Sequence, residues 1–353
     1  MKKIVLTGGE SAAMLERIVE HFSGRGYCVL TVPEGATLFA RSGVDFQTSN
    51  EEMFLESQRQ LLEFQLEMEE RMERIAQHSS QPVLMLCDHG TMDIRACLPD
   101  AVWQRILAEM GMSVVELRDA RYDAVLHIST AAKSAEHIFP LVNNTVLSGS
   151  SELARTIGDR LMAAWTGHPH LRVIDGNCGF EEMINRVITE ISHILSDQPI
   201  EIERKYLVEV VREIPNGNVS DIWQTYLLPA DGHERRLRRR GEGGHYIYFL
   251  TTKIRIAADR SYEHEKRISE SEYKKLLAEA NPAKQTIHKK RCCFLWENQY
   301  FELDTFLTPR LPYCMMEIED AESPEDVSFP PFIRVVRDVT GNPAYSNSNI
   351  ARL

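Results

Sequence analysis

Three charged side chains alternate along residues 201–205, which read Glu-Ile-Glu-Arg-Lys. Alternate side chains of a β-strand point to the same face, so Glu201, Glu203 and Lys205 would share one face. Burying two carboxylates and an ammonium without partners costs several kcal/mol, so they suit an apolar core poorly. The segment therefore predicts a strand whose charged face lines a wet cavity that holds a metal ion and a polyanion.

The same alternation of charge returns in later segments. Arg236 and Arg238 would share one strand face, and Lys289 and Arg291 another. The other charged residues at every second position are Lys253, Glu263, Glu265, Arg267, Glu302, Asp304, Glu317 and Glu319. Carboxylates are the hard oxygen ligands that Mg²⁺ and Mn²⁺ prefer, whereas Arg and Lys bind phosphate oxygens. Together these residue types are the parts needed for phosphoryl transfer from a triphosphate.

The elements that would position these residues are mostly strands. Asp231-Gly232 and Gly243-Gly244 are hairpin-turn signals, and Ser269 with Glu272 forms a capping box for one helix over 269–280. Strands are expected over 200–208, 220–228, 234–241, 246–256, 262–268, 286–297, 299–306 and 313–319. Eight antiparallel strands predict a closed barrel. The polar tail over 340–353 either packs across the tunnel or frays.

On these motifs, residues 200–353 resemble a CYTH domain of the triphosphate tunnel metalloenzyme family. The Glu-x-Glu-x-Lys motif of that family matches the segment that begins at Glu201. Four further motifs match in order, namely Arg236-x-Arg238, Lys289-x-Arg291, Glu302-x-Asp304 and Glu317-x-Glu319. The resemblance implies an α+β fold with an antiparallel eight-stranded tunnel, which binds a linear triphosphate together with Mg²⁺ or Mn²⁺.

The resemblance also implies a role for each matched residue. It makes Glu201, Glu203 and Lys205 catalytic. The implied metal ligands are Glu201, Glu203, Glu317 and Glu319, together with Glu302 and Asp304. The implied triphosphate-binding residues are Lys205, Arg236, Arg238, Lys253, Arg267, Lys289 and Arg291.

Several functions are compatible with such a tunnel. The family includes inorganic, thiamine and RNA triphosphatases and adenylate cyclases. We expect a phosphohydrolase that acts on inorganic tripolyphosphate or a nucleoside triphosphate. An adenylate cyclase reaction on ATP is a second interpretation, and a non-enzymatic sensor of a nucleotide, polyphosphate or phosphoinositide is a third. The charged residues could also be plain cross-strand ion pairs on a solvated sheet face.

Residues 1–196 alternate short apolar runs with helical stretches, which predicts a separate α/β domain with a parallel sheet and helices on both faces. Strands are expected over 3–6, 26–31, 83–87, 124–128 and 171–174, with helices over about 50–77 and 180–195. Residues 196–200, which include Asp197 and Pro199, read as the linker to the second domain.

A glycine loop follows the first expected strand, where a P-loop would lie. A Walker A motif needs Gly-x4-Gly-Lys-Ser/Thr, but the last three of those positions here are Ala13, Met14 and Leu15. Residues 84–88 have the form of a Walker B strand that ends in a carboxylate. This half resembles the P-loop ATP/GTP-binding domain that some CYTH proteins carry, as in the insect photoreceptor translocation-defect protein. We expect a degenerate ATP- or GTP-binding module or scaffold, whose remaining contacts would be Gly8, Gly9, Ser11 and Asp88.

The composition bears on nucleic-acid binding, membrane insertion and cellular compartment. The formal net charge of −12 argues against a general nucleic-acid surface. We find no apolar run long enough to span a membrane, and the apolar stretch near the N-terminus is too short for a signal peptide. The seven cysteines lack paired spacing, which favours a reducing cytoplasm.

Overall fold

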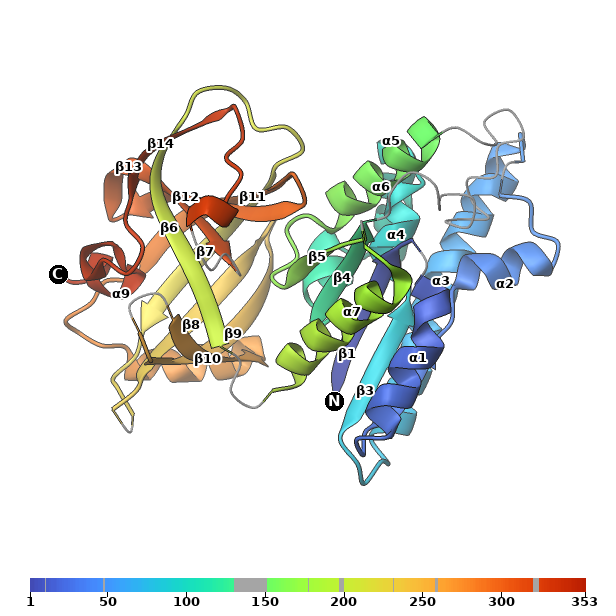
Figure 1. The fold of residues 1–353 in the computed structure, drawn as a ribbon, viewed down its shortest axis with the longest axis horizontal. Helices are drawn as coiled ribbons and strands as arrows, with labels where there is room; N and C mark the ends of the chain where they lie inside the picture. Colours follow the sequence, from blue (N-terminus) through green and yellow to red (C-terminus); the bar gives the residue numbers. More distant parts are fainter. Residues whose placement is uncertain are drawn as a thin grey trace. The chain divides into compact units, whose positions relative to one another are not determined.

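The computed structural model in Figure 1 describes residues 1–9, 11–46, 48–129, 151–176, 178–196, 200–230, 232–257, 260–319 and 324–353. For residues 11–13, 151–156, 200–201 and 255 it describes the backbone alone. The chain divides into two compact units, Met1–Ile191 and Ser192–Leu353. The division falls inside α7 (Phe180–Leu195), a few residues before the linker predicted over 196–200. No helix in the described ranges is long and apolar enough to cross a membrane.

The first unit contains a five-stranded parallel sheet in the order β2-β3-β1-β4-β5. Its strands are β1 (Lys2–Gly8), β2 (Cys28–Val32), β3 (Val83–Asp88), β4 (Ala124–Ser129) and β5 (Leu171–Asp175). The helices before α7 are α1 (Ser11–Ser23), α2 (Gly35–Arg41), α3 (Glu51–Ala76), α4 (Thr91–Ala96), α5 (Asp100–Met110), the π-helical η1 (Val115–Asp119) and α6 (Ser151–Trp165). Strand β3 is buried at every position, as expected for a parallel sheet that is covered on both faces.

The second unit contains a nine-stranded antiparallel sheet. Its strands are β6 (Ile200–Val210), β7 (Asn218–Tyr226), β8 (Glu234–Glu242), β9 (His245–Arg255), β10 (Arg260–Ile268), β11 (Ile287–Trp296), β12 (Gln299–Thr308), β13 (Arg310–Glu319) and β14 (Ile333–Asp338). The order is β10-β9-β8-β7-β11-β12-β13-β6-β14, and β10 also pairs with β6. Eight strands therefore close into the ring that the sequence predicts. The short helices are α8 (Glu270–Leu276), η4 (Leu277–Glu279), η5 (Pro324–Asp326), η6 (Pro343–Tyr345) and α9 (Asn347–Ile350).

Strand β14 is not among the strands predicted from the sequence. This strand pairs with the last residues of β6, which extends beyond the stretch that pairs with β10. The first residues of β6 pair with β10 to close the ring, with Ile200 opposite Tyr262. The last residues of β6 pair with β14, with Val210 opposite Ile333. Strand β6 thus pairs with β13 along one edge, while its other edge pairs with β10 at the start of the strand and with β14 at its end.

One apolar cluster of the second unit lies on the face of the ring strands opposite to the charged residues. Tyr206 and Val208 alternate with Lys205 along β6 and are almost fully buried. They pack with Phe294, Phe301 and further residues of β12, β13 and the 327–333 segment. A second cluster, which includes Ile287, Phe306 and Met315, lies on the same face as the charged residues, with Phe306 opposite Lys289 in the β11–β12 register. The period of two therefore gives one apolar face to the wall, whereas the other face carries the charged side chains together with a smaller apolar cluster.

Gly8, which ends β1, is required by packing against β4. Its φ of +93° is in the left-handed region, and a Cβ there would lie 2.2 Å from the carbonyl oxygen of Ile128. The next residue, Gly9, donates its backbone N–H to the same oxygen at 3.3 Å. Gly8 therefore has a structural reason that is independent of any nucleotide.

We predict that Gly8→Ala destabilises the first unit far more than Gly26→Ala does. Gly26 also has a positive φ, of +86°, but a Cβ there meets nothing within 4 Å. The Gly26 variant should therefore lose only the conformational cost of about 1–2 kcal/mol, while the Gly8 variant adds a backbone clash. Chemical denaturation of the two variants measures the difference, and equal losses would contradict the packing explanation.

Candidate functional site

A cavity of about 480 Å³ in the second unit is the setting for four of the predicted residues. This volume lies in the range of small-molecule sites. Glu203, Lys205, Arg236 and Lys253 line it. The C-terminal tail supplies other lining residues, namely Gly341, Asn342, Ser346, Asn347, Ser348, Asn349 and Arg352. The tail thus packs at the cavity, which resolves the alternative that the sequence left open.

Lys205 joins the carboxylates of two neighbouring strands. Its Nζ lies 3.1 Å from Oε1 of Glu203 and 2.8 Å from Oε1 of Glu317. Lys205 and Glu317 face each other in the β13–β6 register, so barrel closure sets this contact. The three side chains are between 6% and 19% exposed. One ammonium therefore serves two largely buried carboxylates at the edge of the cavity.

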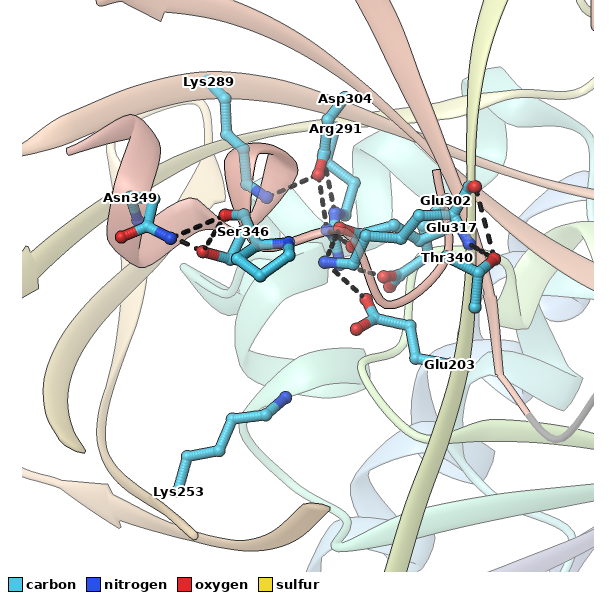
Figure 2. A network of polar contacts seen from close by, with 12 residues as sticks. Glu203, Lys253, Lys289, Arg291, Glu302, Asp304, Glu317, Thr340, Ser346 and Asn349 are labelled. Atoms are coloured by element: carbon cyan, nitrogen blue, oxygen red, sulfur yellow. Dashed lines mark hydrogen bonds and ion pairs between the residues drawn. The ribbon is translucent and has the colours of Figure 1, made fainter. Parts of the chain in front are cut away.

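Arg291 binds three carboxylates deeper in the wall. Its Nε and one terminal nitrogen donate to both oxygens of Asp304 at 2.8 and 2.7 Å. The same terminal nitrogen donates to Oε2 of Glu317 at 2.6 Å, and the other one pairs with Glu302. Lys289 pairs with Asp304 as well. Figure 2 shows this cluster, with Lys253 projecting toward it from a different strand.

The cluster is close to electrically balanced. Its members are the four acids Glu203, Glu302, Asp304 and Glu317 and the three cations Lys205, Lys289 and Arg291. When all seven are ionised, four negative charges face three positive ones, which leaves one excess negative charge. In the described part of the chain, the other charged residues that line the cavity are mostly cations, namely Arg236, Lys253, Arg260 and Arg352 against the single acid Glu234.

The same contacts set the protonation of the cavity edge. Burial would raise the pKa of Glu317, but Lys205, Lys289 and Arg291 hold it well below its usual range. Burial raises the pKa of Glu203, against the opposing effect of Lys205. Burial would lower the pKa of Lys205, but Glu203 and Glu317 raise it, so this ammonium is charged at neutral pH.

A second set of ion pairs joins β8, β9 and β10. One nitrogen of Arg236 lies 2.7 Å from Oε1 of Glu263, and Lys253 Nζ lies 3.0 Å from Oε2 of the same carboxylate. Arg238 pairs with Glu265 at 3.2 Å. Glu263 and Glu265 therefore serve as counterions for the predicted phosphate-binding cations.

The remaining predicted residues are placed differently. Arg267 is exposed on β10 and is not among the residues that line the cavity. Glu319 is half-buried and faces Glu203 in the β13–β6 register. The backbone of Glu201 pairs with Ser261, while its side chain lies outside the described residues. Arg240 was missed by the prediction, although it continues the alternation of Arg236 and Arg238 and is only 1% exposed.

Glu203 and Glu317, at the cavity edge, fit a divalent cation that takes only two ligands from the protein. In the part of the chain that the structure describes, no group of three or more His, Cys, Asp or Glu side chains is arranged to hold a metal ion. Mg²⁺, however, is commonly held by one or two carboxylates, with waters and substrate phosphates as its other ligands. Glu203 and Glu317 already share one cation and fit such a site, whereas Glu302 and Asp304 are held by Arg291 and Lys289.

Two of the predicted nucleotide contacts of the first unit, Gly9 and Asp88, have internal partners. Asp88 ends β3, is 7% exposed and lies 3.3 Å from Nδ1 of His89. Met14, at the Walker lysine position, is fully buried in the core. The side chain of Ser11 lies outside the described residues. Asp93 caps α4 by accepting the N–H of Gly90 at 2.6 Å.

His89 carries a shifted pKa among these carboxylates. Burial would lower it, but Asp88, Asp93 and Glu34 raise it to about 9. Nearby His127 is displaced in the opposite direction, since burial and the charge of His89 lower its pKa to about 4. The acids at this edge of the sheet are therefore compensated from within the chain.

Comparison with known proteins found one family and several solved structures. A family model for an AAA domain matches residues 3–182. No curated protein is significantly similar to the chain. The crystal structures of the hypothetical protein NE1496 and of the inorganic triphosphatase NE1496 are 27% identical to it and have TM-scores of 0.32. They cover 43% of this chain, and 97% and 93% of their own chains.

A further solved structure is that of the PH1012 protein from Pyrococcus horikoshii OT3. It is 20% identical, covers 36% of this chain and 82% of its own chain, and has a TM-score of 0.29. Likeness at TM-scores this low does not establish an activity for this chain.

We predict that Arg291→Met strongly destabilises the second unit. The change leaves Asp304, Glu302 and part of Glu317 without their shared cation, which costs about 3–5 kcal/mol for a buried pair. Arg267→Met is the matched control, because Arg267 is exposed, and it should change stability by no more than about 0.5 kcal/mol. Denaturant unfolding measures both variants. Equal stability of the two would show that the network does not hold the barrel together.

We also predict a pH dependence that His89 imposes on the first unit. The pKa of His89 is raised to about 9 in the folded state, so protonated His89 stabilises the fold. This contribution to the free energy of unfolding is complete below about 6.5, the pKa of histidine in the unfolded chain. It is lost as the pH rises through about 9. The melting temperature of the wild type should therefore fall between pH 7 and pH 10 more steeply than that of His89→Gln, whereas parallel curves would exclude this role for His89.

Proposed function

The chain belongs to the AAA domain family through residues 3–182, which are 180 of its 353 residues, and we propose that the unit outside this match carries the activity. The proposed activity is that of a divalent-metal-dependent phosphohydrolase, which acts on a linear triphosphate in the tunnel. The substrate would be inorganic tripolyphosphate or a nucleoside triphosphate. The observation that carries this proposal is the Lys205 ammonium between Glu203 and Glu317 at the edge of a cavity that Arg236 and Lys253 also line.

In this proposal the basic residues bind phosphate and the acidic residues bind the metal. Lys205, Arg236 and Lys253 come from three different strands and would bind the non-bridging phosphate oxygens. Glu203 and Glu317 would hold Mg²⁺ or Mn²⁺, which supplies charge neutralisation and lowers the pKa of a bound water. For tripolyphosphate, water adds to the terminal phosphorus as the anhydride bond breaks, which gives diphosphate and phosphate. The cations of the cavity would stabilise the charge that develops on the leaving oxygen.

We propose that the first unit is an impaired nucleotide-binding module or a scaffold. Met14 fills the lysine position, the Gly9 N–H is bonded to Ile128, and Asp88 is close to His89. None of these three can serve ATP or GTP without giving up its present role. All seven cysteines are free thiols, which favours a reducing compartment such as the cytoplasm.

An adenylate cyclase reaction on ATP is the second candidate. Ser346, Ser348 and Asn349 form a neutral wall beside the cations, and their present partners within the chain include Pro343 and Glu234. Such a wall suits an uncharged part of a substrate that extends beyond its phosphates. Cyclisation would require the ribose 3′-hydroxyl in line with the α-phosphate and the exclusion of water.

We predict that Glu203→Gln lowers turnover by about 100-fold or more while the barrel stays folded, because the change removes one charge and almost no volume. Phosphate release and product chromatography with tripolyphosphate or ATP, in Mg²⁺ or Mn²⁺, measure the effect. Glu270→Gln, at the exposed start of α8, is the matched control. Asp88→Asn tests the first unit. Both should keep the wild-type rate.

The outcomes separate the candidates. A folded Glu203→Gln variant with full turnover would refute the proposed site. Cyclic AMP as the product from ATP would replace hydrolysis by cyclase chemistry. Tight triphosphate binding without any product, in several divalent metals, would favour the sensor interpretation.

A further inference from the structure

We propose that the Lys205 ammonium is an internal substitute for the divalent cation, and that its transfer to phosphate couples metal binding to triphosphate binding. This inference rests on the proposed function and adds to it the order and the coupling of the two binding events. It assigns Lys205 to two positions. In the ligand-free protein Lys205 neutralises Glu203 and Glu317, and in the complex it binds the triphosphate.

The geometry places Lys205 where a metal between these carboxylates would lie. Nζ is 3.1 Å from one oxygen of Glu203 and 2.8 Å from one oxygen of Glu317. A divalent cation that bound the same two oxygens would be a close neighbour of the ammonium, with charge of the same sign. Because like charges repel strongly when they share the same two largely buried oxygens, the two cannot occupy this place together.

The ammonium can leave while the rest of the site stays fixed. The backbone N–H of Lys205 donates to Oγ1 of Thr340 at 3.1 Å, and its carbonyl accepts the N–H of Val339 at 2.9 Å. Only the flexible side chain of Lys205 is therefore free to change position. Glu317 keeps its orientation, because its second oxygen accepts from Arg291 at 2.6 Å. Displacement of the ammonium thus leaves a carboxylate that is already aimed at its next cation.

The cavity provides the second position for the ammonium. Lys205 lines it together with Arg236 and Lys253, so a rotation about the side-chain bonds would bring Nζ to a phosphate held by these two cations. A metal alone must displace Lys205 with no anion to receive it. A triphosphate alone meets a Lys205 that is bound to carboxylates. Each ligand therefore binds weakly alone and raises the affinity of the other by the same factor.

Binding of Mn²⁺ alone tests the first half of the inference. Electron paramagnetic resonance of free Mn²⁺, or calorimetry, gives its affinity for wild-type protein and variants without any anion. Lys205→Met should bind Mn²⁺ about 10-fold more tightly than wild type, because no ammonium competes. Lys205→Arg keeps the charge and should bind it no more tightly than wild type. Lys274→Met is the matched control, since its contact is with the exposed Glu270 of α8, and it should stay within about 2-fold.

A non-hydrolysable imido-bridged tripolyphosphate tests the second half. Without metal, Lys205→Met should bind this analogue about as well as wild type does, whereas Lys253→Met should bind it less well. With Mn²⁺ present, and after correction for the Mn²⁺ that the analogue chelates in solution, wild type should gain affinity. Lys205→Met should lose most of that gain.

The results also separate this inference from the proposed function. Equal Mn²⁺ affinity of wild type and a folded Lys205→Met would refute the substitution by Lys205 and leave the metal site in place. Weaker Mn²⁺ binding by Lys205→Met, or tighter binding by Lys205→Arg, would refute it as well. No Mn²⁺ binding by any of these proteins, with or without the analogue, would refute the metal-dependent function itself.

Discussion

Charge compensation inside a closed ring of strands is the constraint on which the second unit depends. The ring directs alternate side chains inward, and there the carboxylates need cations, since a buried charge without a partner is strongly destabilising. Arg291 satisfies three acids from two strands, and Lys205 satisfies two. The stability of the barrel and the proposed site therefore depend on the same residues, because the charged side chains that neutralise one another in the barrel are those that would bind metal and phosphate.

The two units neutralise their buried carboxylates in different ways. In the first unit Asp93 is fixed by Gly90 and Trp165, and His89 stays charged among buried acids. In the second unit the cavity edge is compensated by a long, flexible lysine, which a metal would replace in the proposed exchange without disturbing the Arg291 contacts. In this proposal, the exchangeable ammonium of Lys205 distinguishes the ligand-binding site of the second unit from the fixed charge network of the first unit.

The period of two and the closed eight-stranded ring could be predicted from the sequence, whereas the register between the ring strands could not. Alternation assigned Glu203, Lys205 and Arg291 to one face, and turn signals separated the ring strands. The contact of Lys205 with Glu317 joins the first and last strands of the ring, so it depends on a register that no local signal encodes. Strand β14 and the exposure of Arg267 likewise follow from where the long strands end. The tail at the cavity is a tertiary contact that its polar composition left undecided.

The most direct test of the account is a crystal structure of the protein with Mn²⁺ and the imido-bridged tripolyphosphate, with the metal located by its anomalous scattering. The account predicts a Mn²⁺ peak bound by Glu203 and Glu317, with Lys205 Nζ withdrawn from both carboxylates and within hydrogen-bond distance of a phosphate oxygen. Arg291 should still hold Asp304 and Glu317. A bound triphosphate with the metal elsewhere, and with Lys205 still between Glu203 and Glu317, would contradict the account.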